Sequence, residues 1–387
     1  MNNLGVIFFL VLTLPRAIAG QKIINDTGEI PFEMVKNTIV IEVNIQGEQR
    51  KFVVDTGGVL IVSQELQNTY NFEIINKTRV SDINKKEIAF KTVLVPDITI
   101  GNWKFDNSKA LVEYLPDTYP NNCYGTDGII GRDFFKDVLM QFDFKRKVMR
   151  LTKNPGVLVL DPSQRTRMDL SDRGLPEIEL FIDGKKQRIE FDSGSGDLFS
   201  YKTKTAKKLK SKTKDNKLKF EGIFSFGVSS KEPSSSERYM IKVKELEIAG
   251  TKIVDFYSNL SKPSAPRIGA GILYYGVVTL DYQNNWFYLD PYETEPDKTF
   301  ESFGFDIAKI NDVYVIKWVL LGSAADSAGL KFGHKILKIN GEDVAQITDG
   351  CSGYLNGYGF NRQGKVVVDY VTATGQIRST KLMKEEY

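Results

Sequence analysis

The chain has 387 residues, more than one domain of usual size, so we expect two or three domains. Lys and Arg (52) nearly balance Asp and Glu (49), and a formal charge of +3 gives no reason to expect a nucleic-acid partner. With one His (His334) and two Cys (Cys123, Cys351), a His-rich zinc site and a CxxC pair are excluded. A Ser-His or Cys-His hydrolase would have to use His334 as its base. We therefore expect carboxylate chemistry without metal or cofactor, and we interpret the two Cys as unpaired and buried.

Residues 1–19 have the pattern of a secretory signal peptide. An apolar run from Leu4 to Leu14 is followed by an Ala-x-Ala cleavage site that ends at Ala19. The run is too short to span a bilayer comfortably, and no later stretch is long and apolar enough to do so. An uncleaved anchor is the alternative, because Arg16 follows the run and no Lys or Arg precedes it. We expect an exported protein, in the periplasm, at the cell surface or in the medium, with no stable membrane span after signal removal.

The next feature is an internal repeat of two strands that form a hairpin. The first copy starts at Thr38 and its second strand ends in Phe52-Val53-Val54-Asp55-Thr56-Gly57; the second starts at Pro176 and ends in Ile189-Glu190-Phe191-Asp192-Ser193-Gly194. Each copy continues, at nearly the same spacing, with a short apolar-glycine segment (128–131 and 268–271) and a strand that begins at Asp143 or Asp281. We predict two mostly β lobes, residues 20–155 and 156–295, with turn-forming residues 154–163 as the connector.

Two polar segments interrupt the second copy. Residues 202–219 are crowded with Lys, and we expect a solvated helix and loop there. The alternative is an electrostatic landing patch for an acidic partner or a membrane surface. Ser residues cluster between 229 and 236, which is typical of a flexible loop.

Asp55 and Asp192 are the candidate catalytic pair. Peptide hydrolysis without a metal or a nucleophilic side chain needs one group to activate water and another to protonate the carbonyl oxygen or the leaving nitrogen. Two carboxyl groups held about 3 Å apart cannot both ionise comfortably, so they share one proton and supply both roles. Five residues of the two loops support the pair: Thr56, Gly57, Ser193, Gly194 and Ser195. The glycines permit tight turns, and the hydroxyl groups of Thr56 and Ser193 can hydrogen-bond across the lobe junction.

On these motifs, residues 35–292 resemble the pepsin/retropepsin aspartic peptidases. The resemblance implies a bilobed acid-protease β-barrel fold in which each lobe supplies one catalytic Asp. It also implies that an extended substrate pairs with the enzyme as a strand and that a flap closes over it. By position the flap comes from residues 72–94, with its tip near 80–88. The second apolar-glycine segment, Ile268-Gly269-Ala270-Gly271, departs from the usual pattern.

A further departure from the family concerns the residue after each glycine. Bilobed members usually carry Ser or Thr there, and viral members carry Ala; this chain has Gly58 in the first copy and Ser195 in the second. Ser195 can donate a hydrogen bond to Asp192, whereas Gly58 offers Asp55 no hydroxyl. Hydrogen bonds to the ionised form lower the pKa of a carboxyl group. We therefore predict that Asp192 is the more acidic member and that the activity optimum is less acidic than that of pepsin.

From about residue 300 the pattern changes again. The run from Gly322 to Gly341, completed by Val344, resembles the core of a PDZ domain of the bacterial protease-associated kind, which we place at residues 296–387. Ala324 stands where Pro is common and His334 where Asp is common. We expect His334 to be a surface or turn residue rather than a catalyst. The resemblance implies a carboxylate-binding loop that holds a peptide C-terminus, formed by Phe303, Gly304 and Phe305.

The sequence thus predicts a mostly β, bilobed aspartic endopeptidase followed by a PDZ-like domain. Its expected partners are an extended peptide or protein substrate and a C-terminal peptide at the PDZ domain, and we expect a monomer because both lobes lie on one chain. Two intact aspartates favour an enzyme. The alternative is a non-catalytic peptide-binding protein on a peptidase-like scaffold, for which Gly58 and the degenerate second segment leave room. A glycosidase would need carboxylates too, but no other motif supports one.

Overall fold

The computed structural model describes residues 20–23, 28–81, 87–113, 121–202, 217–222, 236–261, 266–310, 312–347, 350–356 and 358–387. The expected signal peptide lies outside these residues. So do residues 82–86 of the expected flap tip, most of the Lys-rich segment (203–216) and most of the Ser-rich segment (223–235). Within the described part of the chain, no helix has the length and apolar character needed to cross a membrane.

The first lobe is built mainly from strands. They are β1 (Gly20–Ile23), β2 (Glu29–Val35), β3 (Thr38–Ile45), β4 (Glu48–Asp55), β5 (Ile61–Ser63), β6 (Glu73–Ser81), β7 (Glu87–Ile100), β8 (Trp103–Glu113), β9 (Gly128–Gly131), β10 (Leu139–Asp143) and β11 (Val148–Thr152). In the described part of this lobe they are accompanied by the short helix α1 (Gln64–Tyr70) and the 3₁₀ helices η2 (Asn121–Tyr124) and η3 (Arg132–Phe134). The hairpin β3–β4 turns at Gln46 and Gly47, both at positive φ, as a tight two-residue turn requires.

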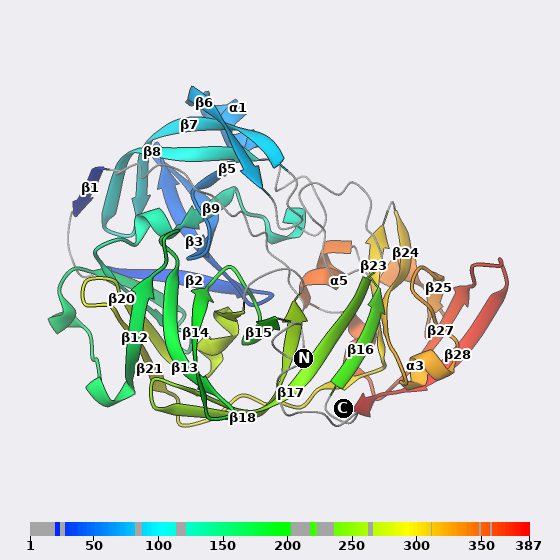
Figure 1. The fold of residues 1–387 in the computed structure, drawn as a ribbon. Coiled ribbons are helices and arrows are strands. Elements are labelled where there is room, and N and C mark those ends of the chain that lie inside the picture. The colour runs from blue at the N-terminus through cyan, green and yellow to red at the C-terminus, as the bar shows by residue number, and fades with distance from the viewer. Residues whose placement is uncertain are drawn as a thin grey trace.

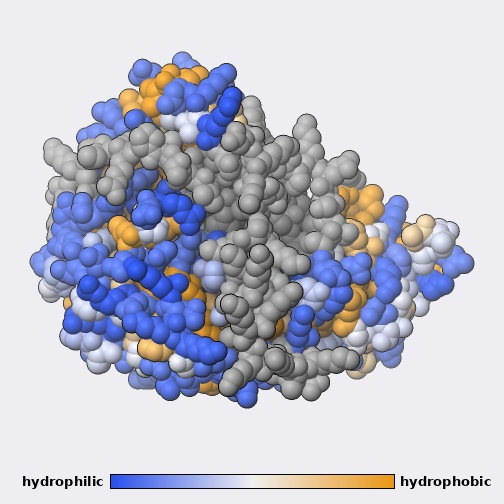
Figure 2. Space-filling model, in the orientation of Figure 1, coloured by the Kyte–Doolittle hydropathy of each residue, from blue (hydrophilic) through white to orange (hydrophobic). Residues whose placement is uncertain are grey.

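The second lobe repeats this plan after a connector with two 3₁₀ turns, η4 (Pro155–Val157) and η5 (Pro162–Gln164). Its elements are β12 (Arg165–Leu170), β13 (Pro176–Ile182), β14 (Lys185–Asp192), β15 (Phe199–Lys202), β16 (Lys217–Gly222), β17 (Ser236–Ile248), β18 (Thr251–Ser261), β19 (Arg267–Gly269), η7 (Ala270–Tyr274), β20 (Gly276–Asp281) and β21 (Trp286–Pro291). Figure 1 shows the first lobe in blue and cyan above the mostly green second lobe. Hydrophilic side chains cover most of the described surface of the second lobe on the face in Figure 2.

The two lobes share one sheet. In it the strand order is β2, β11, β10, β20, β21 and β12, all antiparallel, and the central pair β10–β20 joins one lobe to the other. Buried residues of both lobes belong to a single apolar cluster that includes Phe142 from β10 and Val278 from β20. Because backbone hydrogen bonds and a common core cross the junction, the lobes are held at a fixed distance.

The C-terminal unit has its own apolar core around Phe305, Ile316 and Val368. Its elements are β22 (Glu301–Ser302), β23 (Phe305–Ile310), β24 (Val313–Leu320), α3 (Ala324–Ser327), β25 (Lys335–Ile339), β26 (Glu342–Asp343), α4 (Val344–Ile347), α5 (Gly350–Asn356), η8 (Gly359–Arg362), β27 (Lys365–Val371), β28 (Ile377–Met383) and β29 (Glu385–Glu386). It joins the second lobe through β16, which pairs antiparallel with β24 between Phe220–Gly222 and Trp318–Leu320. Figure 1 shows this unit, in yellow to red, beside both lobes.

The prediction that the two Cys are unpaired is wrong. Cys123 of η2 and Cys351 of α5 form a disulfide, although 228 positions separate them. The prediction rested on their distance in sequence and their different domains. The structure shows that helix α5 of the C-terminal unit lies against the first lobe, which brings the two residues together.

The interpretation of His334 is correct in part. It does lie in a turn, where its Nδ1 accepts a hydrogen bond from the backbone N–H of Lys331 at 3.2 Å. It is not a surface residue, because only 8% of it is exposed and its ring stacks on Tyr370 at 5.2 Å. Burial, with help from Arg378 and Lys331, lowers the pKa of His334. The neutral ring therefore acts as a packing and turn-capping group.

Candidate active site

Two equivalent strand pairs place Asp55 and Asp192. Asp55 ends β4, which runs parallel to β9 with Asp55 opposite Gly131. Asp192 ends β14, which runs parallel to β19 with Asp192 opposite Gly269. Both pairs carry buried apolar residues on their inner face, including Val54 and Phe191 beside the two aspartates. The repeat thus delivers one carboxyl group from each lobe to the lobe junction.

The loops after the two aspartates are locked together by reciprocal hydrogen bonds. The backbone N–H of Thr56 donates to Ser193 Oγ, and the N–H of Ser193 donates to Thr56 Oγ1, each at 3.0 Å. Each hydroxyl then donates to a carbonyl of the opposite lobe, Thr56 to Phe191 O at 3.2 Å and Ser193 to Val54 O at 2.9 Å. All of these groups are buried, so each bond satisfies a polar group that water does not reach.

Gly57 and Gly194 let each loop approach the opposite aspartate. A Cβ at Gly194 would lie 2.5 Å from Cγ of Asp55, and a Cβ at Gly57 would lie 2.9 Å from Cγ of Asp192. Neither neighbour can move far, because the carboxyl groups are enclosed. Any larger residue at these positions would therefore separate the two aspartates.

The two carboxyl groups are buried and interact directly with each other. Burial raises the pKa of Asp192 well above its usual value, and the negative charge on Asp55 adds to this rise. Burial also raises the pKa of Asp55, but hydrogen bonds from Asp192 and from the N–H groups of Gly57 and Gly58 oppose it. Asp192 therefore holds the shared proton and Asp55 carries the charge.

The prediction that Asp192 is the more acidic member is therefore wrong. Ser195 was expected to donate its hydroxyl to the carboxylate. Its backbone N–H donates to the main-chain carbonyl of Asp192 at 3.0 Å, as the N–H of Gly58 does to that of Asp55 at 3.1 Å. The side chain of Asp192 accepts from the N–H of Gly194 at 3.0 Å. On the first lobe, the N–H of Gly57 donates to Oδ1 of Asp55 at 2.8 Å. The two loops thus give their aspartates equivalent amide bonds, and burial together with the charge on Asp55 raises the pKa of Asp192 further.

Charged side chains that the sequence reasoning missed surround the pair. Nη1 of Arg267 lies 3.3 Å from Oδ2 of Asp192, and Arg173 lies 3.5 Å from Glu190. Nη1 of Arg132 donates to the carbonyl oxygens of Gly57 and Gly58 at 3.1 and 3.0 Å. A signal existed in the sequence, since Glu190 and Arg267 are charged residues within short apolar strands.

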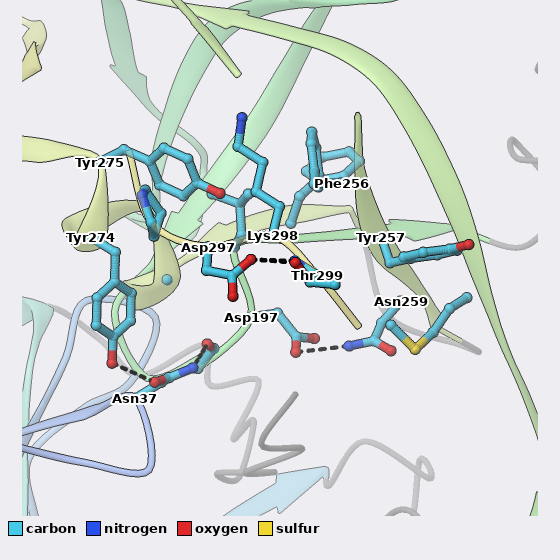
Figure 3. Close-up of a pocket in the computed structure, with 16 residues that line it drawn as sticks. Asn37, Asp197, Phe256, Tyr257, Asn259, Tyr274, Tyr275, Asp297, Lys298 and Thr299 are labelled. Atoms are coloured by element: carbon cyan, nitrogen blue, oxygen red, sulfur yellow. Dashed lines mark hydrogen bonds between the residues drawn. The ribbon is translucent and has the colours of Figure 1, made fainter. Parts of the chain in front are cut away.

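Beside the second catalytic loop lies a cavity of about 290 Å³. Figure 3 shows Asp197 and Asn259 facing each other beneath a group of aromatic rings. The amide of Asn259 donates to Oδ1 of Asp197 at 2.8 Å, and burial raises the pKa of Asp197. On another wall, Tyr274 donates to Oδ1 of Asn37, whose amide donates to Gly196 O, so a first-lobe residue helps to line this second-lobe cavity.

The opposite side of the pair is apolar and includes residues of the C-terminal unit. Tyr354 and Leu355 of α5 pack in one cluster with Val53, Val59 and Phe90, which lie beside Asp55 or on the predicted flap hairpin β6–β7. The hydroxyl of Tyr354 is 2.9 Å from that of Tyr124, next to the disulfide. Helix α5 therefore places its apolar side chains against the first lobe, while Tyr358 and Phe360 fill the core of the C-terminal unit.

The predicted carboxylate loop is closely packed. Phe303 and Phe305 are 1% and 3% exposed, and the rings of Phe305 and Phe360 stack at 5.7 Å. Gly304 has φ 80°, and its N–H donates to Ser302 Oγ at 3.0 Å. A peptide carboxylate would therefore have to compete with Ser302 for this amide. As for metals, the described residues contain no cluster of three or more His, Cys, Asp or Glu side chains suited to an ion.

Comparison with known proteins agrees with this geometry. Residues 41–134 match the aspartyl protease family, and residues 294–350 match the PDZ domain family. The protein therefore contains an aspartyl protease domain and a C-terminal PDZ domain. More particularly, the aspartyl protease match falls in the first of two mostly β lobes, and the PDZ domain follows the second. No curated protein matches the chain. Among solved structures, the basic 7S globulin from soybean is similar at 8% identity and a TM-score of 0.42, over 68% of this chain and 94% of the globulin.

Proposed function

We propose that this protein is an exported aspartic endopeptidase in which Asp55 and Asp192 are the catalytic residues. The observation that carries the proposal is the carboxyl pair itself: one group from each lobe, both buried, sharing one proton and locked by Thr56 and Ser193. A protein that only bound peptides would have no use for two acids forced together at the cost of burying a charge. The aspartyl protease match supports the reaction class.

The protonation states define the roles in hydrolysis. Asp55, as the carboxylate, takes a proton from a water molecule whose oxygen attacks the peptide carbonyl carbon. Asp192 gives its proton to the carbonyl oxygen, so the addition product carries two hydroxyl groups. When the C–N bond breaks, Asp55 returns its proton to the nitrogen and one hydroxyl returns a proton to Asp192. The pair ends as it began, ready for a further cycle.

Two further features support parts of this proposal. The disulfide Cys123–Cys351 favours an oxidising compartment, in agreement with an exported protein. The PDZ domain favours peptide recognition, either of substrate or of a C-terminus. We propose that the enzyme acts as a monomer, since one chain provides both aspartates.

The test is cleavage of a denatured, alkylated protein by the purified protein from about pH 3 to 8. The proposal expects cleavage by the wild type, loss of at least about a thousandfold in Asp55→Asn and in Asp192→Asn, and no loss in the exposed control Asp169→Asn. A wild type that binds the unfolded protein as tightly as both Asn variants do, without cutting it, would instead establish the peptide-binding scaffold.

A further inference from the structure

The duplication of the lobes provides an internal comparison for the surroundings of each aspartate. Two residues before Asp55 lies Val53, which pairs with Ile129 on β9. The equivalent pair in the second lobe, two residues before Asp192, is Glu190 on β14 and Arg267 on β19. The two pairs occupy the same place in the repeat, yet one is apolar and the other is charged.

All four residues are buried. Val53 and Ile129 are each 4% exposed, and Glu190 and Arg267 are 8% and 5% exposed. The first lobe shows that this place in the fold packs well with aliphatic side chains. Burying two opposite charges there brings a desolvation penalty that the apolar pair avoids, so stability does not explain the exchange.

Arg267 is directed at the carboxyl pair. Its Nη1 lies 3.3 Å from Oδ2 of Asp192, with 6% and 0% of the two side chains exposed. In so dry a place solvent screens the attraction only weakly. Arg267 also lowers the pKa of Asp55, so its charge acts on both members of the pair.

Other charged residues lie close to Arg267 and the carboxyl pair. The charge of Arg267 lowers the pKa of both Asp197 and Glu190. Glu190 also pairs with Arg173, and Arg132 interacts electrostatically with Asp55 and Glu190. Among these charged residues, Arg267 is the cation that contacts a carboxyl oxygen of the pair, and Glu190 lies opposite it in strand register.

We propose that Arg267 is a positioning residue of the pair. Its positive charge favours the ionised form of each carboxyl group and Glu190 opposes this effect, so that together they set the pH range in which the pair carries one proton. This inference rests on the proposed peptidase function. A positive charge favours ionised carboxyl groups, so Arg267 moves both protonation steps of the pair to lower pH. Glu190, when ionised, moves them to higher pH.

The experiment compares the pH–rate profiles of the wild type with those of three single variants. Arg267→Gln is expected to move both limbs to higher pH by roughly one to two units, and Glu190→Gln is expected to move them to lower pH by a smaller amount. Arg267→Lys keeps the charge and should restore most of the wild-type profile. Arg267→Gln with unshifted limbs, or a Lys variant that behaves like Gln, would overturn the proposal, because a purely structural role does not predict opposite shifts for opposite charges.

Two additions keep the test decisive. The double variant Glu190→Val with Arg267→Ile copies the first-lobe pair, so it should fold even where a single variant does not, and its limbs should still move to higher pH. Titration of the ¹³C-labelled aspartate carboxyl groups by NMR measures the same shifts without any cleavage. If no protein cuts peptides but the carboxyl titration moves as expected, the peptidase proposal fails and the role of Arg267 stands. If cleavage occurs and neither readout moves, the role of Arg267 fails alone.

Discussion

Cys123 and Cys351 join 3₁₀ helix η2 of the first lobe to helix α5 of the PDZ domain by a disulfide that closes a loop of more than half the chain. The second lobe holds the PDZ domain independently, through the β16–β24 pairing. The PDZ domain is thus fastened to both lobes, at one point by a covalent bond and at the other by backbone hydrogen bonds.

Removing the disulfide should lower the free energy of unfolding. A cross-link of this length restricts the unfolded chain, and its loss is expected to cost about 2–4 kcal/mol in Cys123→Ser with Cys351→Ser. Thermal unfolding of the wild type and the double variant, each with and without dithiothreitol, checks this. The reductant should lower the melting temperature of the wild type to that of the variant and leave the variant unchanged. A wild type that is indifferent to reductant would show that the link contributes nothing.

Because Thr56 and Ser193 hydrogen-bond to each other's loops, substitutions at the two positions should lower the free energy of unfolding by less than the sum of their separate effects. Thr56→Val leaves the N–H of Ser193 and the carbonyl of Phe191 buried without that partner, and Ser193→Ala does the same to the opposite loop. Each change should cost roughly 1–3 kcal/mol. The second change should add less than the first, because the loops are already released. Urea denaturation of the wild type, the two single variants and the double variant measures this, with the exposed Thr69→Val as a control. Fully additive losses of unfolding free energy would contradict the coupling.

At position 58, introducing the residue that is usual in the family should lower activity rather than raise it. A Cβ at this position would lie 2.7 Å from Oδ2 and 2.9 Å from Cγ of Asp55. Gly58→Ser, which restores the residue common in bilobed relatives, should therefore displace Asp55 and lower kcat by roughly tenfold or more. The reciprocal change, Ser195→Gly, should have the smaller effect. Steady-state kinetics of both variants decide the matter, and a more active Gly58→Ser would mean that the loop relaxes around the added side chain.

The buried carboxyl group of Glu113 should make the first lobe more stable at low pH than at high pH. Its carboxyl group is 3% exposed and has no hydrogen-bond partner among the described residues, and burial raises its pKa from 4.5 to about 7. The folded state therefore binds this proton more tightly than the unfolded state. The stabilisation is fully present below pH 4.5 and is lost as pH rises to about 7, with a total effect of roughly 3 kcal/mol.

Urea denaturation at several pH values checks this dependence. Glu113→Gln should be more stable than the wild type at pH values above about 7 and should lose this part of the pH dependence. The exposed Glu42→Gln serves as the matched control and should follow the wild type. If the free energy of unfolding changes with pH equally in Glu113→Gln and in the wild type, another group is responsible for the pH dependence.

The sequence was sufficient for features that repeat or that follow from local geometry. Two strands ending in Asp-Thr-Gly and Asp-Ser-Gly predicted the lobes and the meeting of Asp55 with Asp192, because strand period and glycine turns are local properties. The Cys123–Cys351 bond was missed because it depends on how one domain lies on another, which no local pattern encodes. The relative acidity of the two aspartates was predicted wrongly because it was judged from the Ser195 hydroxyl, whereas burial and the charge on Asp55 raise the pKa of Asp192. Glu190 and Arg267 could have been found by comparing the two copies residue by residue.

The pairing of β16 with β24 also bears on how the protein is made. Trp318–Leu320 come later in the chain than the whole second lobe, so a second lobe that folds first presents Phe220–Gly222 without this partner strand. Such an edge can pair with another chain. The PDZ domain then covers this edge from within the same molecule, which protects the second lobe against pairing with another chain.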